Sequence, residues 1–273
     1  MAPSTLARYE SEWRRFREAV PPHFVLSDIV NYLASLTYSH ARTARPALGF
    51  FLPHGTLDSE LVSRVVAGLF RRDPLPARRV VEPSVLPRLL AHLDSWGVLE
   101  SLSLERLIDR CLVLFRLSSW ARSSDAARVR RHTVVFSDGF MHYVVERPKQ
   151  ARQSHPHHRS LVAEHPSAVR CPVRHALHLV RRTPGLEFLF GESEEQLASR
   201  VRRLLAEVGI DVTPHALRHI GASAALAWGF AVDVVCLHGG WSTERPILKH
   251  YAQAWPGRSG RSPPPHVSLA ALW

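Results

Sequence analysis

Residues 213–219 read Thr-Pro-His-Ala-Leu-Arg-His. Thr213 is a preferred N-cap residue and Pro214 suits the first helical position, so this stretch predicts the beginning of a helix. His215 and Arg218 stand three residues apart and therefore share one face of that helix. Because the first turns of a helix favour anions, the pair predicts a seat for a phosphate group. A His and an Arg on any basic surface would give the same pattern, so the choice rests on the rest of the sequence.

The periodicity of the rest of the chain predicts a mainly α protein with a small β-sheet. Residues 104–115 carry apolar side chains at helical spacing and indicate a buried helix. Residues 133–136 and 141–145 are rich in β-branched and aromatic side chains, and the Ser-Asp-Gly at 137–139 between them is a hairpin signal. Residues 150–168 are rich in His, Pro and Ser and predict a loop.

Breaks in this periodicity divide the chain into two domains. Residues 1–72 contain four stretches of helical spacing and predict a compact helical domain. Residues 73–84 are rich in proline and arginine and predict a basic linker. A second domain is expected over residues 85–255, where Ser-Glu-Glu-Gln at 193–196 is a capping box that predicts the start of a helix. A proline-rich tail occupies residues 256–273.

The composition excludes several classes of protein. The 273 residues are 45% hydrophobic and 22% charged, which is typical of a globular protein. No apolar run approaches the roughly eighteen residues needed to span a membrane, and the polar N-terminus lacks a secretory signal. Cys111, Cys171 and Cys236 form no CxxC pattern, which argues against a disulfide framework or a cysteine zinc site. We therefore expect an intracellular protein without a membrane partner.

The charge balance favours a polyanionic partner. Lys and Arg number 35 against 24 Asp and Glu, which gives a formal net charge of +11. Cations that contact phosphates release condensed counterions, so such an excess favours nucleic acid. GC-rich coding also enriches arginine, so charge alone does not decide between nucleic-acid binding and a bland basic surface.

Four further residues give the histidine–arginine pair a context. Arg122 follows the predicted buried helix in the sequence WARSSD, and Lys149 follows the second strand of the hairpin in ERPKQAR. Trp241 lies in HGGWST, 23 residues after Arg218, and Tyr251 lies in LKHYAQ ten residues later. Each short motif is weak alone, whereas their order along the chain is specific.

Taken in order, Arg, Lys at a hairpin, HxxR, Trp and Tyr resemble the tyrosine recombinase (phage integrase) family. The segments TLARYESEWRRF, ERPKQARQ and GGWS…LKHY look most like the recombinases of DIRS-type retrotransposons and cryptons. The resemblance covers both domains and implies a helical core-binding domain at 1–72 ahead of a tyrosine-recombinase-like catalytic domain, the two clamping duplex DNA. The interval from Trp241 to Tyr251 departs from the family pattern because Pro246 interrupts it.

The resemblance implies cleavage and rejoining of DNA strands without a metal ion or nucleotide cofactor. Tyr251 would attack the scissile phosphorus and form a phosphotyrosyl bond. Arg122 and Arg218 would bind the nonbridging oxygens, where negative charge grows in the transition state. Lys149 would protonate the departing 5′ oxygen, and His215 would assist proton transfer or position the phosphate.

Several expectations about the working complex follow from the same resemblance. Trp241 would either pack in the site or donate a hydrogen bond through its indole N–H, and the sequence leaves both roles open. Family members usually act as tetramers on two DNA sites, so we expect self-association on DNA and no small-molecule substrate. The outcome would be the integration or excision of a mobile element, in the nucleus if the host is a eukaryote.

Three other interpretations compete with this one. His215 and His219 have the spacing of metal ligands, but Ala216 stands where a zinc protease helix carries Glu, which argues against a metal hydrolase. A DNA-binding protein that kept the fold and lost catalysis is more serious, although every expected reactive residue type is present. A purely structural helical protein would not need this charge.

Overall fold

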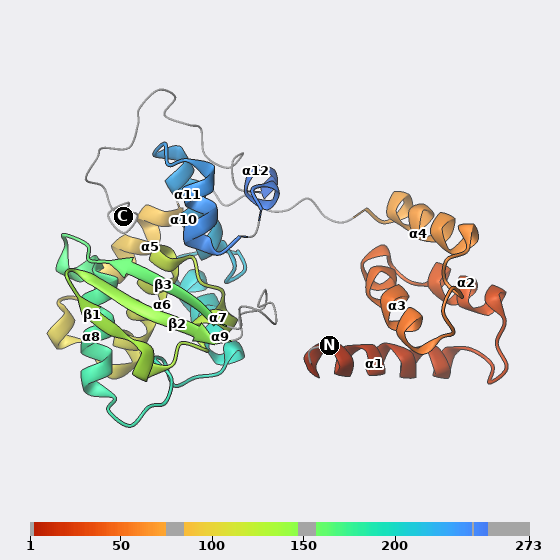
Figure 1. The fold of residues 1–273 in the computed structure, drawn as a ribbon, viewed down its shortest axis with the longest axis horizontal. Helices are drawn as coiled ribbons and strands as arrows, with labels where there is room; N and C mark the ends of the chain where they lie inside the picture. Colours follow the sequence, from red (N-terminus) through yellow and green to blue (C-terminus); the bar gives the residue numbers. More distant parts are fainter. Residues whose placement is uncertain (1–2, 75–84, 147–156, 242, 251–273) are drawn as a thin grey trace. The chain divides into compact units, whose positions relative to one another are not determined.

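The computed structural model describes residues 3–74, 85–146, 157–241 and 243–250 (Figure 1). The chain divides into two compact units, Met1–Arg78 and Arg79–Trp273. Most of the predicted linker at 73–84 and all of the predicted tail at 256–273 lie outside the described residues. Within the described ranges, no helix has the length and apolar character needed to span a bilayer.

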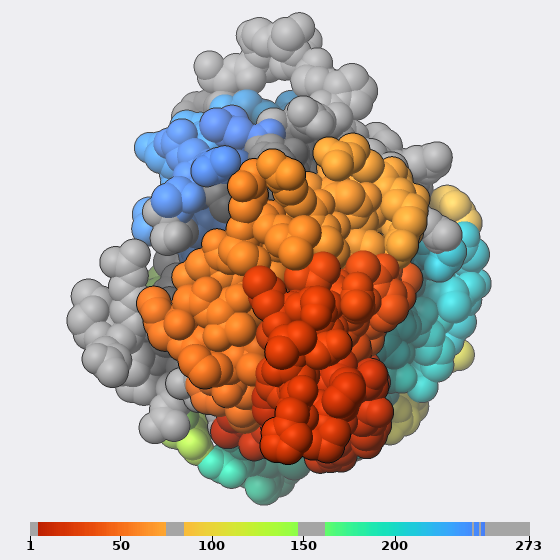
Figure 2. Space-filling model, turned by 90° about the vertical axis from the view of Figure 1, so that its right-hand side faces the viewer, coloured from red at the N-terminus to blue at the C-terminus, as the bar shows by residue number. Residues whose placement is uncertain are grey.

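The described residues of the first unit form four helices, as the spacing of its apolar residues predicts. These are α1 (Pro3–Ala19), α2 (Leu26–Ser35), α3 (Tyr38–Phe51) and α4 (Glu60–Arg72). Phe16 of α1 is fully buried and meets Phe24 and Tyr32 edge-on, at ring-centroid distances of 5.0 and 5.2 Å. Figure 2 shows α1, in red, lying against the orange helices of the same unit. Aromatic contacts of this kind add to the stabilisation from apolar burial.

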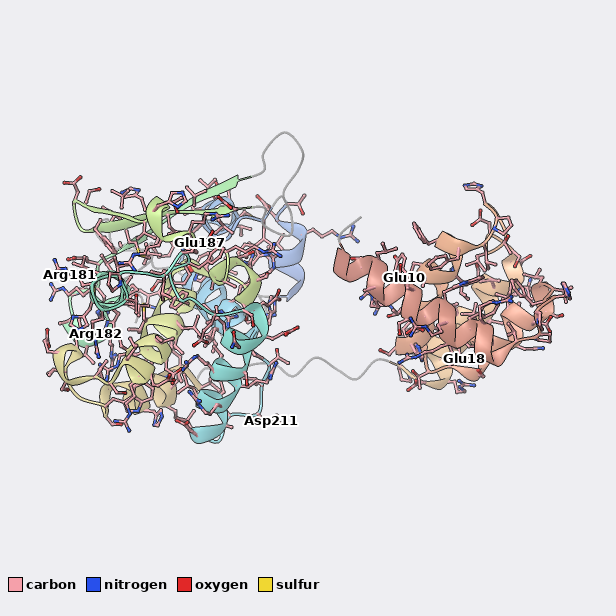
Figure 3. All side chains as sticks on the ribbon, turned by 90° about the horizontal axis from the view of Figure 1, so that it is seen from below. Glu10, Glu18, Arg181, Arg182, Glu187 and Asp211 are labelled. Atoms are coloured by element: carbon pink, nitrogen blue, oxygen red, sulfur yellow. The ribbon has the colours of Figure 1, made fainter. Side chains whose placement is uncertain are left out.

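A buried carboxylate also joins α1 to α3. Glu12 is 5% exposed, and its two carboxylate oxygens lie 3.0 Å from Nη1 of Arg15 and 2.7 Å from Nε2 of His40. A buried charge is costly unless it is paired, and both partners meet that need. Glu10 and Glu18 of the same helix are exposed instead and point away from the unit (Figure 3).

The second unit combines helices with a three-stranded sheet. Its helices are α5 (Val85–Asp94), α6 (Leu104–Ser119), α7 (Ser123–Ala126), α8 (Pro172–Arg182), α9 (Glu194–Glu207), α10 (Ala216–Ala227), α11 (Val232–Gly239) and α12 (Arg245–His250), and its strands are β1 (Val135–Ser137), β2 (Phe140–Glu146) and β3 (His157–Ala163). The expectation of a mainly α protein with a small β-sheet is confirmed (Figure 1).

Helix α6 lies at the centre of this unit. It is buried continuously from Leu107 to Ser119, and α8, α9 and α10 lie against it. Ser103 caps its N-terminus by accepting a hydrogen bond from the backbone N–H of Arg106 at 3.3 Å. The predicted buried helix over 104–115 is therefore confirmed, and it continues to the residues that precede Arg122.

The sheet is antiparallel with the order β1-β2-β3. Asp138 and Gly139 form the predicted hairpin turn, and both have positive φ angles of 49° and 79°, as a two-residue turn between twisted strands requires. The prediction of a loop over 150–168 is wrong for β3, which pairs with β2 from His157 to Ala163. The polar composition of this segment gives no strand signal, because the strand depends on its long-range pairing with β2.

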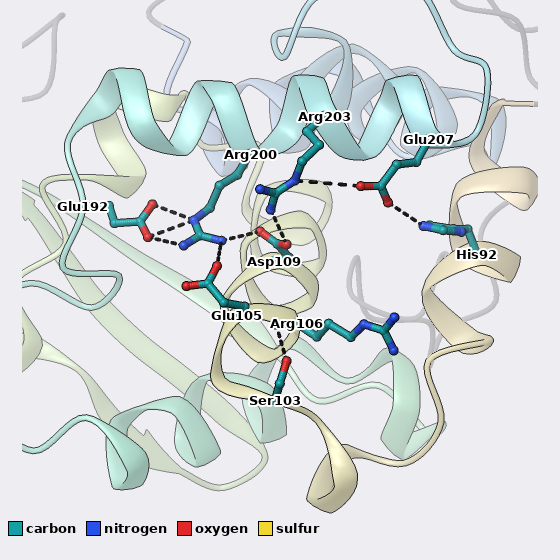
Figure 4. A network of polar contacts seen from close by, with 9 residues as sticks. All are labelled: His92, Ser103, Glu105, Arg106, Asp109, Glu192, Arg200, Arg203 and Glu207. Carbon is teal, nitrogen blue, oxygen red and sulfur yellow. Dashed lines mark hydrogen bonds and ion pairs between the residues drawn. The ribbon is translucent and has the colours of Figure 1, made fainter.

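A network of ion pairs fixes α9 on α6 (Figure 4). The predicted capping box opens α9, since the hydroxyl of Ser193 accepts from the N–H of Gln196 and the Gln196 side chain accepts from the N–H of Ser193. Further along α9, Arg200 donates to Glu192, and to Asp109 of α6 at 2.9 Å. Asp109 also accepts from Arg203, at 2.8 Å. These ion pairs therefore tie α9 to α6 through Asp109.

Candidate active site

The C-terminal end of α6 carries the first candidate residue. Trp120 follows the helix with a left-handed backbone (φ 51°) and is fully buried. Arg122 stands at the N-terminal boundary of α7, where its backbone N–H donates to Oδ2 of Asp125 at 3.1 Å. The guanidinium of Arg122 lies 3.5 Å from the same carboxylate and is 22% exposed. Asp125 therefore orients Arg122, and part of the Arg122 side chain remains open to solvent.

The helix that carries His215 and Arg218 starts later than the sequence predicts. Thr213 is not its N-cap, because the carbonyl of Thr213 accepts from the N–H of Ala216 at 2.8 Å and closes a turn. Helix α10 begins at Ala216, and His215 occupies the N-cap position with helical dihedral angles. The two candidate residues still lie in the first turn, where Arg218 N donates to the carbonyl of His215 at 3.1 Å.

Arg218 is held from three sides. Its side chain is almost completely buried, with an exposed fraction of 2% for the residue. Nη1 donates to the carbonyl of Trp120 at 2.6 Å, and Nη2 donates to the carbonyl of Gly239 at 2.7 Å. The guanidinium carbon lies 3.9 Å from the ring centroid of Trp241, which is a cation–π contact. The structure thus brings together Arg218, Trp241 and Trp120, which precedes Arg122 by two residues.

His215 stands in a strongly positive environment. Burial, together with repulsion from His219, Arg218, Arg122 and Arg116, lowers its pKa to about 4. The rings of His215 and His219 have their centroids 5.4 Å apart. An imidazole with this pKa is neutral near pH 7, so it can accept a proton or a hydrogen bond.

Two residues that the sequence reasoning did not single out contribute contacts to this site. The carbonyl of Trp120 accepts a hydrogen bond from Arg218. The Trp120 ring packs edge-on against the ring of His238, with the two centroids 4.4 Å apart. Nε2 of His238 lies 2.6 Å from the carbonyl of Ser118 at the end of α6. Both residues adjoin motif residues in the sequence, in WARSSD and HGGWST, and that adjacency is the signal that points to them.

Lys149 and Tyr251 lie outside the described residues. Strand β2 ends at Glu146, three residues before Lys149, and α12 ends at His250, the residue before Tyr251. Pro246 is the second residue of α12, where its missing N–H has no helical partner to lose. The departure seen in the sequence therefore does not break the helix that leads to Tyr251.

The described part of the chain offers no metal centre. Within it, no three His, Cys, Asp or Glu side chains are grouped so that they could hold an ion. What the site does assemble is cationic, with Arg122 and Arg218 near a neutral imidazole. Such a set suits the binding of a phosphate anion and the stabilisation of charge that develops on it.

The chain is similar to known proteins both in sequence and in fold. No protein-family model matches the chain. Tyrosine recombinase XerA of Pyrococcus furiosus is 26% identical over 220 residues, which cover 73% of this chain and 73% of that protein. The chain is therefore similar in sequence to a tyrosine recombinase.

Solved structures show the fold. The XerH site-specific recombinase bound to palindromic difH substrate aligns with 92% of this chain and 76% of its own, with a TM-score of 0.64 and 14% identity. A lambda integrase dimer bound to a COC' core site aligns with 96% and 92%, with the same TM-score and identity. The Tn1549 transposon integrase in complex with circular intermediate DNA aligns with 92% and 90%, with a TM-score of 0.62 and 14% identity. The chain has the fold of these recombinases.

Proposed function

We propose that this chain is a site-specific DNA recombinase that cleaves and rejoins duplex DNA through a covalent 3′-phosphotyrosyl intermediate on Tyr251. The observation that carries the proposal is the fixed position of Arg218, which two backbone carbonyls and the Trp241 ring hold in place. Arg122 extends from the loop whose Trp120 carbonyl binds Arg218. Preorganised cations of this kind stabilise a phosphorane-like transition state without moving during the reaction.

The proposed reaction uses five of the candidate residues directly. The Tyr251 hydroxyl attacks the phosphorus and loses its proton, and the bond to the 5′ oxygen breaks as Lys149 protonates that oxygen. The phosphotyrosyl bond conserves the energy for rejoining, which reverses these steps with a new 5′ hydroxyl. His215 accepts a hydrogen bond or a proton in its neutral form, consistent with its lowered pKa. Arg122 and Arg218 bind the nonbridging oxygens.

The contacts of Arg218 hold its guanidinium in place before DNA binds. A guanidinium has five N–H donors, and the carbonyls of Trp120 and Gly239 take two of them. These two bonds and the Trp241 ring fix the guanidinium in one orientation. The entropy of ordering this side chain is therefore already lost before DNA arrives.

The biological setting belongs to the same proposal. The similarity to recombinases, together with the sequence segments quoted above, supports a role in integrating or excising a mobile element of the DIRS or crypton kind. Such a protein works where the DNA is, inside the cell and in the nucleus of a eukaryote. We also propose that it assembles on DNA as a tetramer that holds two duplexes, with 1–72 and 85–255 both contacting DNA.

An inactive DNA-binding protein of the same fold is the second candidate. Arg218 is 2% exposed, and its contacts with Trp120, Gly239 and Trp241 would serve equally well to tie α6, α10 and α11 together. In that case the protein would bind DNA in a salt-dependent way and form no covalent link to it.

Covalent trapping separates the two candidates. The protein is incubated without divalent metal with nicked suicide duplexes from candidate element ends, and the products are run on a denaturing gel. We expect a DNA-linked band that disappears in Tyr251→Phe and persists in Tyr38→Phe, a half-buried tyrosine of the first unit. Tight binding with no linked band on any bound duplex would instead establish the inactive protein.

A further inference from the structure

Arg116 is a buried arginine in the apolar helix α6, and it is not one of the candidate catalytic residues. It is 1% exposed and stands between Phe115 and Leu117, which are both fully buried. Burying a guanidinium costs free energy that a leucine at the same place would not cost. The position therefore calls for a reason beyond filling space.

The contacts of Arg116 join two distant segments of the chain. Its Nε donates to the carbonyl of Ala121 at 3.1 Å, and its Nη2 donates to the carbonyl of Pro214 at 2.8 Å. Ala121 directly precedes Arg122, and Pro214 directly precedes His215. One planar guanidinium thus connects the backbones next to two candidate active-site residues that lie 93 positions apart in the sequence.

The charge of Arg116 is also part of this environment. Its pKa is lowered to about 10, mainly by burial and in part by Arg218, with Asp125 acting in the opposite direction. It therefore remains a cation near pH 7 and adds to the repulsion that keeps His215 neutral. In the described part of the chain its Nη1 is buried and has no hydrogen-bond partner. Its known bonds are the two to the carbonyls.

A second arginine of the same helix shows what such a residue does elsewhere. Arg110 is also fully buried, and it donates to the carbonyls of Gly97 and Leu93 at the end of α5. Its carbonyl partners do not adjoin a candidate residue. Arg110 is therefore a matched control with the same burial, the same helix and the same kind of bonds.

We propose that Arg116 is a positioning residue. Through the carbonyls of Ala121 and Pro214, it holds the backbone segments that carry Arg122 and His215 at a fixed distance from each other. The proposal rests on the proposed function for its catalytic consequence. Lysine cannot replace it, because a single ammonium on a flexible stem does not reproduce the planar fork that reaches both carbonyls. The residue acts through its neighbours and does not touch DNA itself.

The first experiment compares Arg116→Lys with Arg110→Lys in single-turnover cleavage of a suicide duplex. We expect Arg116→Lys to lower the cleavage rate about 100-fold, because small displacements of reacting groups have effects of that order. DNA affinity should stay within about threefold, since the phosphate-facing cations remain. Arg110→Lys should cleave at the wild-type rate even where its melting temperature falls as much. Equal rate losses in both variants would overturn the proposal.

A second experiment needs no activity and therefore separates this proposal from the proposed function. Hydrogen exchange is measured at the amides of Ala216 and Ala126, which donate to the carbonyls of Thr213 and Arg122. We expect both to exchange at least tenfold faster in the Arg116 variants and at the wild-type rate in the Arg110 variants. Unchanged exchange at these amides would reject Arg116 as a positioning residue, whether or not the wild-type protein cleaves DNA.

A third variant covers the case in which Arg116→Lys does not fold. Arg116→Met removes the buried charge and keeps a long apolar side chain, a change that buried ion sites often tolerate. It should show the same faster exchange at both amides. The pKa of His215, followed by NMR, should also rise because one of its four neighbouring cationic or ring groups is gone. Arg110→Met should leave that pKa unchanged, and a His215 pKa that moves equally in both would contradict the proposal.

Discussion

Gly221 of α10 faces the indole ring of Trp120 so closely that a Cβ atom at residue 221 would lie 2.2 Å from Cδ1 of that ring. The carbonyl of Leu117 would lie 2.7 Å from the same Cβ. Helix α10 can therefore approach the end of α6 only without a side chain at this point. This close approach places Arg218, one turn earlier on α10, within reach of the Trp120 carbonyl.

Gly221→Ala should destabilise the second unit. The added methyl group collides with the Trp120 ring and with backbone, and overpacking of this kind costs about 1–3 kcal/mol. Chemical denaturation followed by circular dichroism measures the change. Gly68→Ala in α4 is the control, because a Cβ there meets nothing within 4 Å and should stabilise the helix by about 0.4–1 kcal/mol. A Gly221→Ala protein as stable as the wild type would show that the Trp120 ring moves easily.

Trp241 should act through its ring face more than through its indole N–H. The guanidinium of Arg218 lies over that face, so Trp241→Phe keeps most of the contact and Trp241→Ala removes it. We expect cleavage in Trp241→Phe within about tenfold of wild type and a loss of about 100-fold in Trp241→Ala. Trp96→Ala is the control, since Trp96 also lies under an arginine, Arg110, in a different part of the unit. Equal losses in the Phe and Ala variants would instead assign the role to the N–H.

The stability of the second unit should fall as the pH drops from 6.5 to 4. Burial lowers the pKa of both His215 and His175 to about 4, so the folded protein binds fewer protons than the unfolded chain in this window. The stabilising contribution is therefore complete above the unfolded pKa near 6.5 and is lost progressively as the pH falls. Urea denaturation at several pH values measures the slope.

Neutral substitutions identify the histidines responsible. His215→Gln and His175→Gln should each make the free energy of unfolding less dependent on pH between 6.5 and 4. His54→Gln changes an exposed histidine of the first unit and should leave the slope for the second unit as it is. If the slope survives both substitutions, other groups cause the acid sensitivity.

Local signals in the sequence predicted local structure well. Ser193 and Gln196 form the expected capping box because both bonds are made within four residues. Asp138 and Gly139 form the expected turn because both residues tolerate positive φ angles. The first strand nevertheless begins at Val135, since Thr133, the first residue predicted for it, belongs to the short helix Arg131–Thr133.

Long-range contacts account for what the sequence did not predict. Strand β3 forms because it pairs with β2 along the whole length of that strand. The polar sequence of β3 does not predict this pairing. Thr213 closes a turn with Ala216 in place of capping the helix, because the chain must enter α10 beside the end of α6. Arg218 was predicted as a phosphate-binding residue from its spacing. Its burial under Trp241 depends on three segments that meet only in the folded chain.

Arg200→Met should destabilise the packing of α9 on α6. Arg200 donates to Glu192, Glu105 and Asp109, and Asp109 is only 5% exposed (Figure 4). Removing Arg200 leaves Asp109 with Arg203 as a partner, so we expect a loss of about 2 kcal/mol, less than for a buried charge left without any partner. Denaturation of the purified variant measures this loss.

The control and the rescue both follow from the burial of Asp109. Arg64→Ala breaks an ion pair with Glu60 whose side chains are 75% and 78% exposed, and such pairs contribute about 0–1 kcal/mol. Adding Asp109→Asn to Arg200→Met should recover stability, because the substitution removes the buried charge that the first variant left under-compensated. If the double variant is less stable than Arg200→Met alone, then Arg203 already compensates Asp109, and the loss in the single variant comes from the bonds of Arg200 to Glu192 and Glu105.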